Sequence, residues 1–478
     1  MVFSSALFLF YFLPIFLAGY FLVAPTWRNS YTAGASLVFY AWGAPNFLLL
    51  FLGSCLCDYL IVGVLSSQKT IQRRRGLLAL STVINIGLLL YFKYANFFVA
   101  QLGSIVQALG LSAPHWSKIA LPIGISFFTF HKISYVVDVF RGTSRPTRNF
   151  GEYLLYITFF PQLIAGPIVR YHEIEGQIRS RVVTFEHMRE GVWRFVVGLS
   201  AKLLLADPLG NVASHVFKGD PWNVSTGYTW LGTLAYSLQI YFDFAGYSSM
   251  AVGLALLVGF RFPENFNRPY LSGSITEFWR RWHISLSRWM RDYLYIPLGG
   301  NRVSASRQAL NLWTVFLISG LWHGASWNFI VWGAYHGAFL AIERTPLGRA
   351  YLDLPPLVRR AMAFMTVMFG WVLFRSDTLS DGMARWGRLI GFGGPVASEF
   401  QIPRALMISD VGLGILIIGC AWCLLVEPLL EKMASEKTGQ GPLYREFPLA
   451  YPILAVLFAL CVLAVEAGRY SPFIYFQF

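Results

Sequence analysis

Long apolar runs, separated by short polar connections, recur from one end of the chain to the other. A helix needs about 20 apolar residues to cross the ~30 Å hydrocarbon core of a bilayer, and most of these runs approach or exceed that length. They lie at residues 1–24, 33–43, 46–65, 76–99, 118–140, 190–206, 227–258, 310–343, 359–375, 408–428 and 448–468. The pattern predicts an all-α polytopic membrane protein with about 11 transmembrane helices. We expect a single integral-membrane domain over residues 1–478, without a separate soluble domain.

Two of the apolar segments, the opening run and residues 159–170, need separate interpretation. The opening run has no basic residues before it and is too long for a signal peptide, so we expect it to remain as a transmembrane helix. Residues 159–170, FFPQLIAGPIVR, carry two prolines and a glycine. Both flanks of that segment look cytoplasmic, which favours a re-entrant element over a full crossing.

Residues 274–302, SITEFWRRWHISLSRWMRDYLYIPLGGNR, form an unusual window. Ser274 and Glu277 have the spacing of a capping box, which predicts a helix start. An apolar stripe at helical spacing follows, made of Phe278, Trp282, Leu286, Trp289 and Tyr293. Four arginines, Arg280, Arg281, Arg288 and Arg291, make a bilayer crossing costly. The window therefore predicts an amphipathic helix at the cytoplasmic interface, whose basic surface attracts an anionic donor or contacts lipid head groups.

Composition and charge agree with a membrane protein. Charged residues make up 13% of the 478 residues, which is about half the share in soluble proteins. The net charge of +14 is assigned to cytoplasmic loops, of which the first holds Lys69 and residues 73–75. Three predicted helices precede this cytoplasmic loop, so the N-terminus is expected on the outer side of the membrane. No long basic tract exists to favour nucleic-acid binding, and the five cysteines lie in apolar runs, where they predict buried hydrophobes and not a metal site.

Two histidines, His283 within residues 274–302 and His323, are the strongest candidates for chemistry. His323 lies in the apolar sequence GLWHGASW, and an ionisable side chain at membrane depth is a functional candidate. Burial disfavours the imidazolium, and a neutral imidazole can act as a general base. Gly320, Gly324 and Gly333 would allow close helix packing or a lined passage beside it. The plainer interpretation is an interhelical hydrogen bond, and His336 is where we expect that role.

Other polar residues leave their roles open. Asp243 and Tyr247 would line a cavity within residues 236–253 or bond neighbouring helices. Lys132 and Asp138 have the same two interpretations. His215 and Asp220 match an H-x4-D pattern, but one chance match among eight histidines is unsurprising. The chain contains no Walker A loop, serine-hydrolase elbow or H-E-x-x-H zinc helix, which argues against an ATP-driven pump, a serine hydrolase and a zinc protease.

Several of these motifs together resemble the membrane-bound O-acyltransferase (MBOAT) family, and within it the bacterial alginate-type O-acetyltransferases. The resemblance rests on SITEFWRRWHISLSRWMRDYLYIPLGGNR, YFDFAGYSSMAVGLALLVGFRFPENFNRPY, GLWHGASWNFIVWGAYHG, the segment at 121–142, and the opening and closing residues. It implies a ring of tilted helices around a central passage. It also implies that His323 is the family's invariant histidine and that His283 is its second signature position. One departure is Ser249, where alginate-type members tend to carry an acid.

The resemblance implies transfer of an acetyl group from cytoplasmic acetyl-CoA, with no bound cofactor and no metal. The implied acceptor is a periplasmic SGNH-type acetyltransferase partner that modifies an exopolysaccharide, and the implied location is the bacterial inner membrane. We expect His323 to act as general base or acyl relay, and His283 to orient or polarise the donor thioester. Arg280, Arg281, Arg288, Arg291 and Trp282 are the expected donor-binding residues, and Asp243, Tyr247 and Trp322 are the expected cavity-lining residues. The alternatives are a D-alanyl transferase of the same family acting on teichoic acid, and a polymer or lipid exporter.

Overall fold

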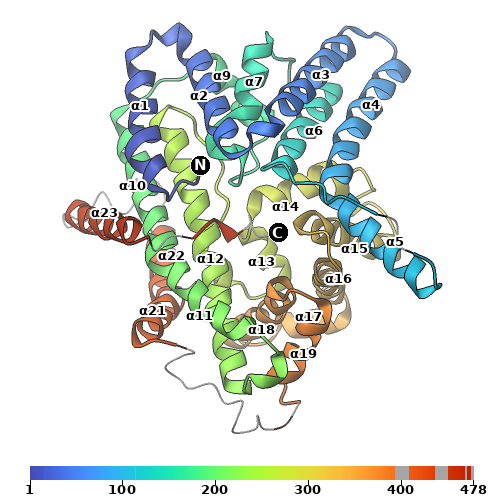
Figure 1. Cartoon of the computed structure of the whole chain (residues 1–478), viewed down its shortest axis with the longest axis vertical. Coiled ribbons are helices and arrows are strands. Elements are labelled where there is room, and N and C mark those ends of the chain that lie inside the picture. Colours follow the sequence, from blue (N-terminus) through green and yellow to red (C-terminus); the bar gives the residue numbers. More distant parts are fainter. Residues whose placement is uncertain (113–114, 393, 395–407, 437–449, 469–470, 475–478) are drawn as a thin grey trace. The chain divides into compact units, whose positions relative to one another are not determined.

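The computed structural model describes residues 1–112, 115–392, 394, 408–436, 450–468 and 471–474. Within these residues every regular element is a helix, so the all-α prediction is confirmed (Figure 1). The described residues form two compact units, one made of residues 1–192 and 251–263 and the other of residues 193–250 and 264–478. Helices α10 (Phe185–Ser200) and α12 (Thr226–Leu257) each contribute residues to both units.

The first unit is built on helices that bury apolar and aromatic faces against one another. Its helices are η1 (Phe8–Phe12), α1 (Leu13–Leu22), η2 (Pro25–Trp27), α2 (Arg28–Gly43), η3 (Pro45–Phe47), α3 (Leu48–Ser67), α4 (Ile71–Leu89), η4 (Leu90–Tyr94), α5 (Ala95–Ala108), α6 (Ile125–Arg141), α7 (Phe150–Thr158), α8 (Phe160–Leu163) and α9 (Tyr171–Arg179). Rings of Phe3, Phe8, Phe39 and Phe160 meet in its core. The expected re-entrant segment contains only the four-residue helix α8 and is buried, so it is too short to cross a membrane.

A buried ion pair joins three helices of this unit. Lys132 on α6 lies 3.0 Å from Asp58 on α3, and both side chains are almost fully buried. Ser81 and Asn85 on α4 donate further hydrogen bonds to the Asp58 carboxylate, at 2.6 and 2.8 Å. Since each charge has a partner and the carboxylate accepts additional donors, Lys132 serves to bond neighbouring helices, which was one of its two interpretations.

The second unit is also entirely helical in its described part. Its helices are η5 (Ala201–Ala206), α11 (Asp207–Phe217), η6 (Pro221–Asn223), η7 (Pro269–Leu271), α13 (Ile275–Arg281), α14 (Ile284–Met290), η8 (Arg291–Tyr295), α15 (Ala305–His323), α16 (Trp327–Ile342), α17 (Pro346–Leu352), α18 (Pro356–Arg375), α19 (Leu379–Leu389), α21 (Asp410–Ala421), η10 (Trp422–Val426), α22 (Glu427–Glu436) and α23 (Ala450–Glu466).

The long apolar run at 310–343 is divided between two helices. The chain turns between α15 and α16 and the two helices pack along each other. A Cβ atom at Gly320 would collide with the carbonyl oxygen of Phe329, and one at Gly333 with that of Phe316. These glycines therefore permit the close packing that was predicted for them.

Six helices of the described chain are long and apolar enough to cross a membrane. They are Pro45–Ser67, Ile71–Ala108, Phe185–Phe217, Thr226–Leu257, Pro356–Arg375 and Asp410–Met433, and two shorter apolar helices lie at Phe8–Leu22 and Ala450–Glu466. Several other apolar runs form helices of fewer than 20 residues, among them α6, α15 and α16. A multi-pass membrane protein is thus confirmed.

Candidate functional site

His283 lies at a break between two short helices. Ser274 caps α13 by accepting a hydrogen bond from the backbone N–H of Glu277 at 3.0 Å, as predicted. The single amphipathic helix that we expected to follow is wrong, because α13 ends at Arg281 and α14 begins at Ile284. Between them, His283 adopts the left-handed conformation with φ of 44°. A non-glycine residue in this region costs about 1–3 kcal/mol and persists only where its surroundings hold it.

Residues 265–267 hold this break in place. The backbone N–H of Asn267 donates to the carbonyl of Arg281, and that of Ile284 donates to the carbonyl of Asn265, both at 2.9 Å. These bonds replace the helical bonds that would otherwise continue α13 into α14. The periodic apolar pattern favoured one helix, but pairing with residues 14 to 19 positions earlier in the chain outweighed it. His283 is thereby fixed at a strained and well-supported position.

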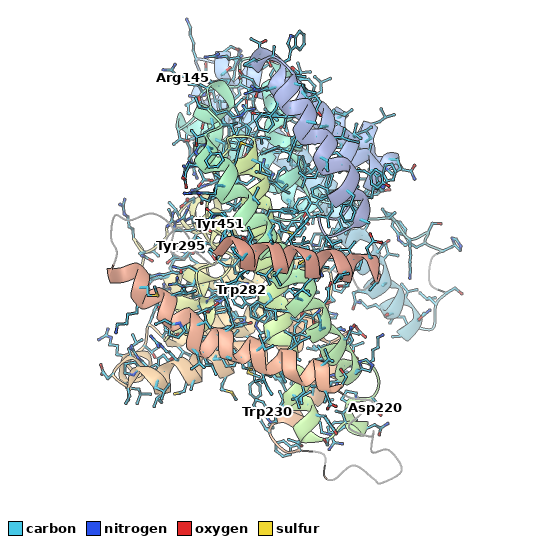
Figure 2. The ribbon with its side chains drawn as sticks, turned by 90° about the vertical axis from the view of Figure 1, so that its left-hand side faces the viewer. Arg145, Asp220, Trp230, Trp282, Tyr295 and Tyr451 are labelled. Carbon is cyan, nitrogen blue, oxygen red and sulfur yellow. The ribbon has the colours of Figure 1, made fainter. Side chains whose placement is uncertain are left out.

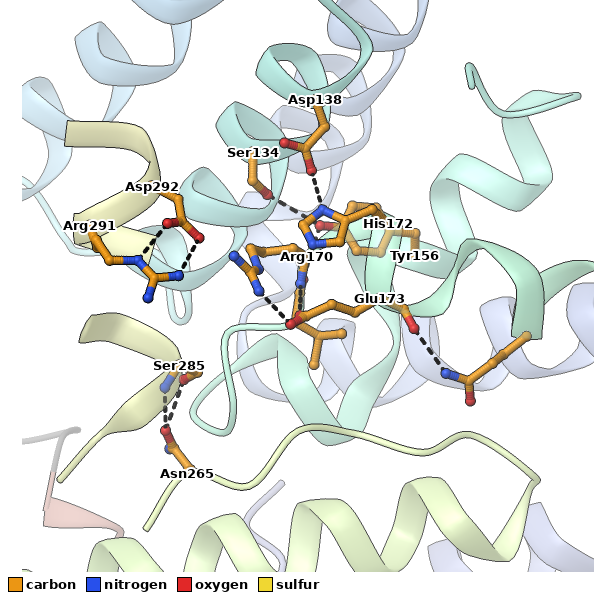
Figure 3. Close-up of polar contacts among 12 residues, drawn as sticks. Ser134, Asp138, Tyr156, Arg170, His172, Glu173, Asn265, Ser285, Arg291 and Asp292 are labelled. Carbon is orange, nitrogen blue, oxygen red and sulfur yellow. Dashed lines mark hydrogen bonds and ion pairs between the residues drawn. The ribbon is translucent and has the colours of Figure 1, made fainter. Parts of the chain in front are cut away.

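The side chain of Asn265 determines which ring nitrogen of His283 carries a proton. Its Oδ1 accepts from the backbone N–H of Ser285 at 3.2 Å and from the Ser285 hydroxyl at 2.8 Å (Figure 3). Because a backbone N–H is always a donor, this atom is the amide oxygen and not the nitrogen. The same oxygen lies 3.0 Å from Nδ1 of His283, which must therefore be the protonated nitrogen.

The other ring nitrogen of His283 is left with a lone pair. Nε2 is buried and has no hydrogen-bond partner in the described part of the chain. His283 lies outside the six membrane-spanning helices, and burial lowers its pKa to about 3. The imidazole is neutral at physiological pH, so Nε2 can accept a hydrogen bond but cannot donate one.

Trp322 brings the two predicted histidines together. His323 ends α15 and its side chain is buried. The ring of Trp322 is centred 4.9 Å from the ring of His323 and 6.2 Å from that of His283. Trp332 and Phe374 pack against the other sides of His323, at 5.1 and 5.2 Å. The sequence thus predicted both histidines, and the structure places them beside one tryptophan within the second unit.

His336 belongs to the same aromatic cluster. Its ring lies 5.0 Å from that of Trp332 and 5.1 Å from that of Trp279. The interhelical hydrogen bond expected for it is wrong, since neither ring nitrogen has a hydrogen-bond partner in the described residues. A Cβ atom added at Gly370 would lie 2.6 Å from Nε2 of His336, so this glycine lets the α18 backbone pack closely against the ring.

The indole nitrogens of Trp279 and Trp332 are likewise buried without a hydrogen-bond partner in the region described. Buried polar atoms of this kind are normally satisfied by ordered water or by a bound polar molecule. Nε2 of His283 and both ring nitrogens of His336 also lack a partner among the described residues, so the cluster has several nitrogens that can still form hydrogen bonds. The arrangement is suited to receiving a polar reactant in an otherwise aromatic environment.

The predicted donor-binding residues do not share one environment: two arginines are ion-paired, two are exposed, and the tryptophan is buried. Arg281 pairs with Glu277 at 2.8 Å and with Glu431 at 2.9 Å, and Arg291 pairs with Asp292 at 2.7 Å (Figure 3). Arg280 and Arg288 are exposed and form no ion pair among the described residues. Trp282, labelled in Figure 2, is 2% exposed and packs on Trp371 and Tyr270, so it faces the interior and not the arginine surface.

Asp243 and Tyr247 contact a buried charged cluster and the segment at 471–474. Asp243 lies 3.2 Å from the ammonium of Lys202, which also lies 2.5 Å from Asp207. The backbone N–H of Ile474 donates to Asp243 at 3.0 Å, and the ring of Phe473 stacks on Tyr247 at 4.5 Å. Sequence reasoning missed Lys202, although a lone lysine in the apolar run FVVGLSAKLLLA was the available signal.

A smaller polar cluster lies in the first unit. Asp138 at the end of α6 lies 2.8 Å from Nδ1 of His172, and Arg170 pairs with Glu173 at 2.7 Å (Figure 3). The hydroxyls of Ser134 and Tyr156 are 3.4 Å apart. Sequence reasoning found no role for His172, but its ring contacts the buried carboxylate of Asp138.

Comparison with known proteins identifies the relatives of this chain. A family model described as MBOAT, membrane-bound O-acyltransferase family, matches residues 144–350, which include both His283 and His323. A probable alginate O-acetylase of Azotobacter vinelandii is 43% identical over 503 residues, covering all of both chains. A peptidoglycan O-acetyltransferase of Helicobacter pylori is 34% identical over 431 residues, which is 82% of this chain and 80% of the relative. A teichoic acid D-alanyltransferase of Streptococcus thermophilus is 31% identical over 292 residues, which is 54% of this chain and 69% of the relative.

Identity over the whole length of both chains, a matching family model and the helical membrane fold lead to one conclusion: the chain belongs to the membrane-bound O-acyltransferase family, and it is an O-acyltransferase.

Proposed function

We propose that this enzyme transfers acetyl groups from acetyl-CoA in the cytoplasm, across the bacterial inner membrane, for O-acetylation of an exopolysaccharide such as alginate. A periplasmic SGNH-type acetyltransferase is the proposed partner that delivers the acetyl group to the polymer. Full-length similarity to an alginate O-acetylase supports acetyl as the group and a polysaccharide as the acceptor. The similarity to a teichoic acid D-alanyltransferase covers only 54% of this chain, which makes D-alanyl transfer the weaker alternative.

The observation that carries the proposal is that two buried histidines, His283 and His323, lie beside the same ring of Trp322. In acyl transfer, a hydroxyl oxygen of the acceptor attacks the acetyl carbonyl carbon while an imidazole nitrogen takes the hydroxyl proton. The C–S bond of the thioester then breaks and the imidazolium returns the proton to the leaving thiolate. The products are an acetyl ester and a free thiol, and no metal or bound cofactor is required.

His323 is the proposed general base. The role of His283 follows from its tautomer, because a neutral ring with Nδ1 protonated presents only an acceptor at Nε2. Polarising the thioester carbonyl would require a donor at that atom. We therefore assign His283 to orienting the reactants by accepting a hydrogen bond from a donor other than the attacking hydroxyl, whose single proton passes to His323. Asn265 holds the His283 ring in this state.

The decisive experiment measures acetate on the polymer secreted by a host strain. His323→Ala should abolish polymer acetylation while the amount of membrane protein is unchanged. His215→Ala is the matched control, because His215 is exposed on α11 and, among the described residues, its ring bonds only to a carbonyl of its own helix. Normal acetylation with His323→Ala would remove this residue from the mechanism.

The donor is tested separately with the purified protein. Saturable binding of acetyl-CoA, measured by calorimetry, is expected for the transferase and not for an exporter of polymer or lipid. Competition by desacetyl-CoA but not by a D-alanyl carrier protein would distinguish the acetyl donor from that of the alternative transferase. Binding of the carrier protein instead would replace the proposed donor.

A further inference from the structure

We propose that Arg28, Arg181 and the first turn of α2 form a binding site for a phosphate group in the first unit. The site is independent of the acyl-transfer chemistry and of every residue assigned to it. Its ligand is a phosphate ester, supplied either by the head group of a membrane lipid or by a soluble phosphorylated molecule.

The first observation is that two guanidinium groups gather around one aromatic ring without an acidic partner. The Cζ atoms of Arg28 and Arg181 lie 5.0 and 5.9 Å from the ring centre of Tyr20. Neither arginine forms an ion pair within the described residues, whereas other arginines of this unit do. Arg170, Arg179 and Arg189 pair with Glu173, Glu175 and Glu186 at 2.7 to 2.8 Å. Two like charges without compensation favour the binding of an anion.

The second observation is that Arg181 is held rigidly with one N–H group to spare. Its Nε donates to the carbonyl of Val258 at 3.0 Å, and its Nη1 donates to Oδ1 of Asn29 at 2.7 Å. The Cζ atom also lies 4.1 Å from the ring centre of Phe260. Nη2 is buried and has no hydrogen-bond partner in the described chain. A donor fixed in this way loses little entropy when it binds a ligand oxygen.

The third observation concerns Arg28 itself. Its side chain makes no hydrogen bond to any described residue, and its Nε is buried. Burial lowers the pKa of Arg181, the Tyr20 hydroxyl opposes this shift, and the charge of Arg28 adds a smaller lowering. Two half-buried guanidinium groups without an acidic partner in the described chain leave positive charge that an anion can balance.

The fourth observation is the start of α2, which lies at Arg28. This 16-residue helix has no side-chain cap and no acidic residue in its first turn. The backbone N–H of Arg28 donates to the carbonyl of Pro25, and the helix dipole adds partial positive charge at this end of α2. Arginine side chains together with a helix N-terminus are the usual surroundings of a bound phosphate.

The surroundings place this site at the edge of a membrane. Leu22, the last residue of α1, is 86% exposed, and Trp27 immediately before α2 is 67% exposed. An exposed tryptophan beside arginines is typical of the level of the lipid head groups. Both a lipid phosphate and a soluble phosphate ester can reach such a position, and they share the chemistry that the arginines recognise.

The test uses the full chain in nanodiscs and in detergent. Arg28→Gln is the main variant, because its side chain makes no hydrogen bond to the described protein and its loss should not unfold the chain. Arg179→Gln is the matched control, since it removes the same charge from an arginine already neutralised by Glu175. Two probes are used: inorganic phosphate, followed by the shift in unfolding temperature in detergent, and phosphatidylglycerol, followed by native mass spectrometry against phosphatidylcholine.

We expect the wild type and Arg179→Gln to bind at least one probe, and Arg28→Gln to bind it about tenfold more weakly, as loss of one charge-assisted hydrogen bond implies. Arg28→Gln combined with Arg181→Gln should abolish the binding. Selective retention of phosphatidylglycerol alone identifies a lipid as the source, and a response to inorganic phosphate identifies a soluble ligand. Absence of both responses in the wild type, or equal binding by Arg28→Gln, overturns the proposal.

Discussion

Two buried polar clusters of this molecule differ in whether their charged and polar groups face a partner. In the first unit, the carboxylate of Asp58 binds Lys132, Ser81 and Asn85 across three helices. In the second unit, Nε2 of His283 and both nitrogens of His336 are equally buried, yet they have no hydrogen-bond partner among the described residues. A cluster whose members satisfy one another stabilises a fold, and a cluster with unmatched nitrogens is suited to act on a reactant.

The largest expected effect comes from removing the proposed base. His323→Gln keeps a polar side chain of similar length but cannot take a proton, so the acetylation rate should fall by about 10²- to 10⁴-fold. The unfolding temperature should change much less than the rate. Both are measured on the purified enzyme, with acetyl-CoA and a hydroxyl acceptor. A loss of rate that merely follows the loss of folded protein would contradict the distinction between the two clusters.

The next effect comes from breaking the paired cluster. Lys132→Met leaves Asp58 charged and buried without its partner, which should lower the free energy of unfolding by about 3–5 kcal/mol. The rate per folded molecule should stay close to that of the wild type. The double variant Lys132→Met with Asp58→Asn removes both charges and should recover much of the loss. Thermal unfolding in detergent measures all three proteins, and a stable Lys132→Met would show that the pair contributes little.

A third prediction concerns Asn265 and the pH dependence of the reaction. Asn265→Ala removes the acceptor that holds Nδ1 of His283 protonated, and kcat should fall about tenfold with KM unchanged. Asn265→Asp places a carboxylate there, which favours the imidazolium and raises the pKa of His283 from about 3. Since His283 must be neutral to accept a hydrogen bond at Nε2, the acidic limb of the rate profile should move to higher pH.

Ser285→Ala serves as the control for the Asn265→Ala and Asn265→Asp variants. The Ser285 hydroxyl donates to Asn265, and no ring nitrogen of His283 bonds to it in the described chain, so its loss should leave the pH profile in place. Nitrogen-15 spectra of labelled histidine provide a measurement without activity, in which His283 should show a protonated Nδ1 that Asn265→Ala abolishes. A wild-type ring protonated at Nε2 would refute the assignment.

The sequence predicted the histidines but not what holds them. His323 and His283 were recognised because an ionisable residue is conspicuous in an apolar run and because the motifs around them resemble a known family. Asn265 was missed, since its role depends on a contact 18 residues along the chain that no periodic pattern reveals. The same contact explains why one helix was expected where α13 and α14 are separate.

Other residues show the same difference: features that depend on neighbours in sequence were predicted, and features that depend on distant contacts were not. The cap at Ser274 and the close packing at Gly320 and Gly333 were predicted because they depend on neighbours in sequence or on residue size. The burial of Trp282 was not, because its place in an apolar stripe is equally compatible with lipid and with the aromatic interior that it occupies. The partners of Lys132 and Asp138 also lie far away in sequence, and these residues therefore stayed ambiguous.

The smallest expected effect distinguishes paired from unpaired arginines at the proposed donor surface. Arg280 and Arg288 have no carboxylate partner in the described chain, whereas Arg291 is bound to Asp292. If this surface attracts the anionic donor, Arg280→Gln with Arg288→Gln should raise the KM for acetyl-CoA by up to about fivefold, since exposed charges contribute little individually. The effect should shrink as salt screens the surface. Arg291→Gln should change KM less, because its charge is already balanced. An equal change in both proteins, or one insensitive to salt, would mean that long-range attraction is absent and that the donor is recognised elsewhere.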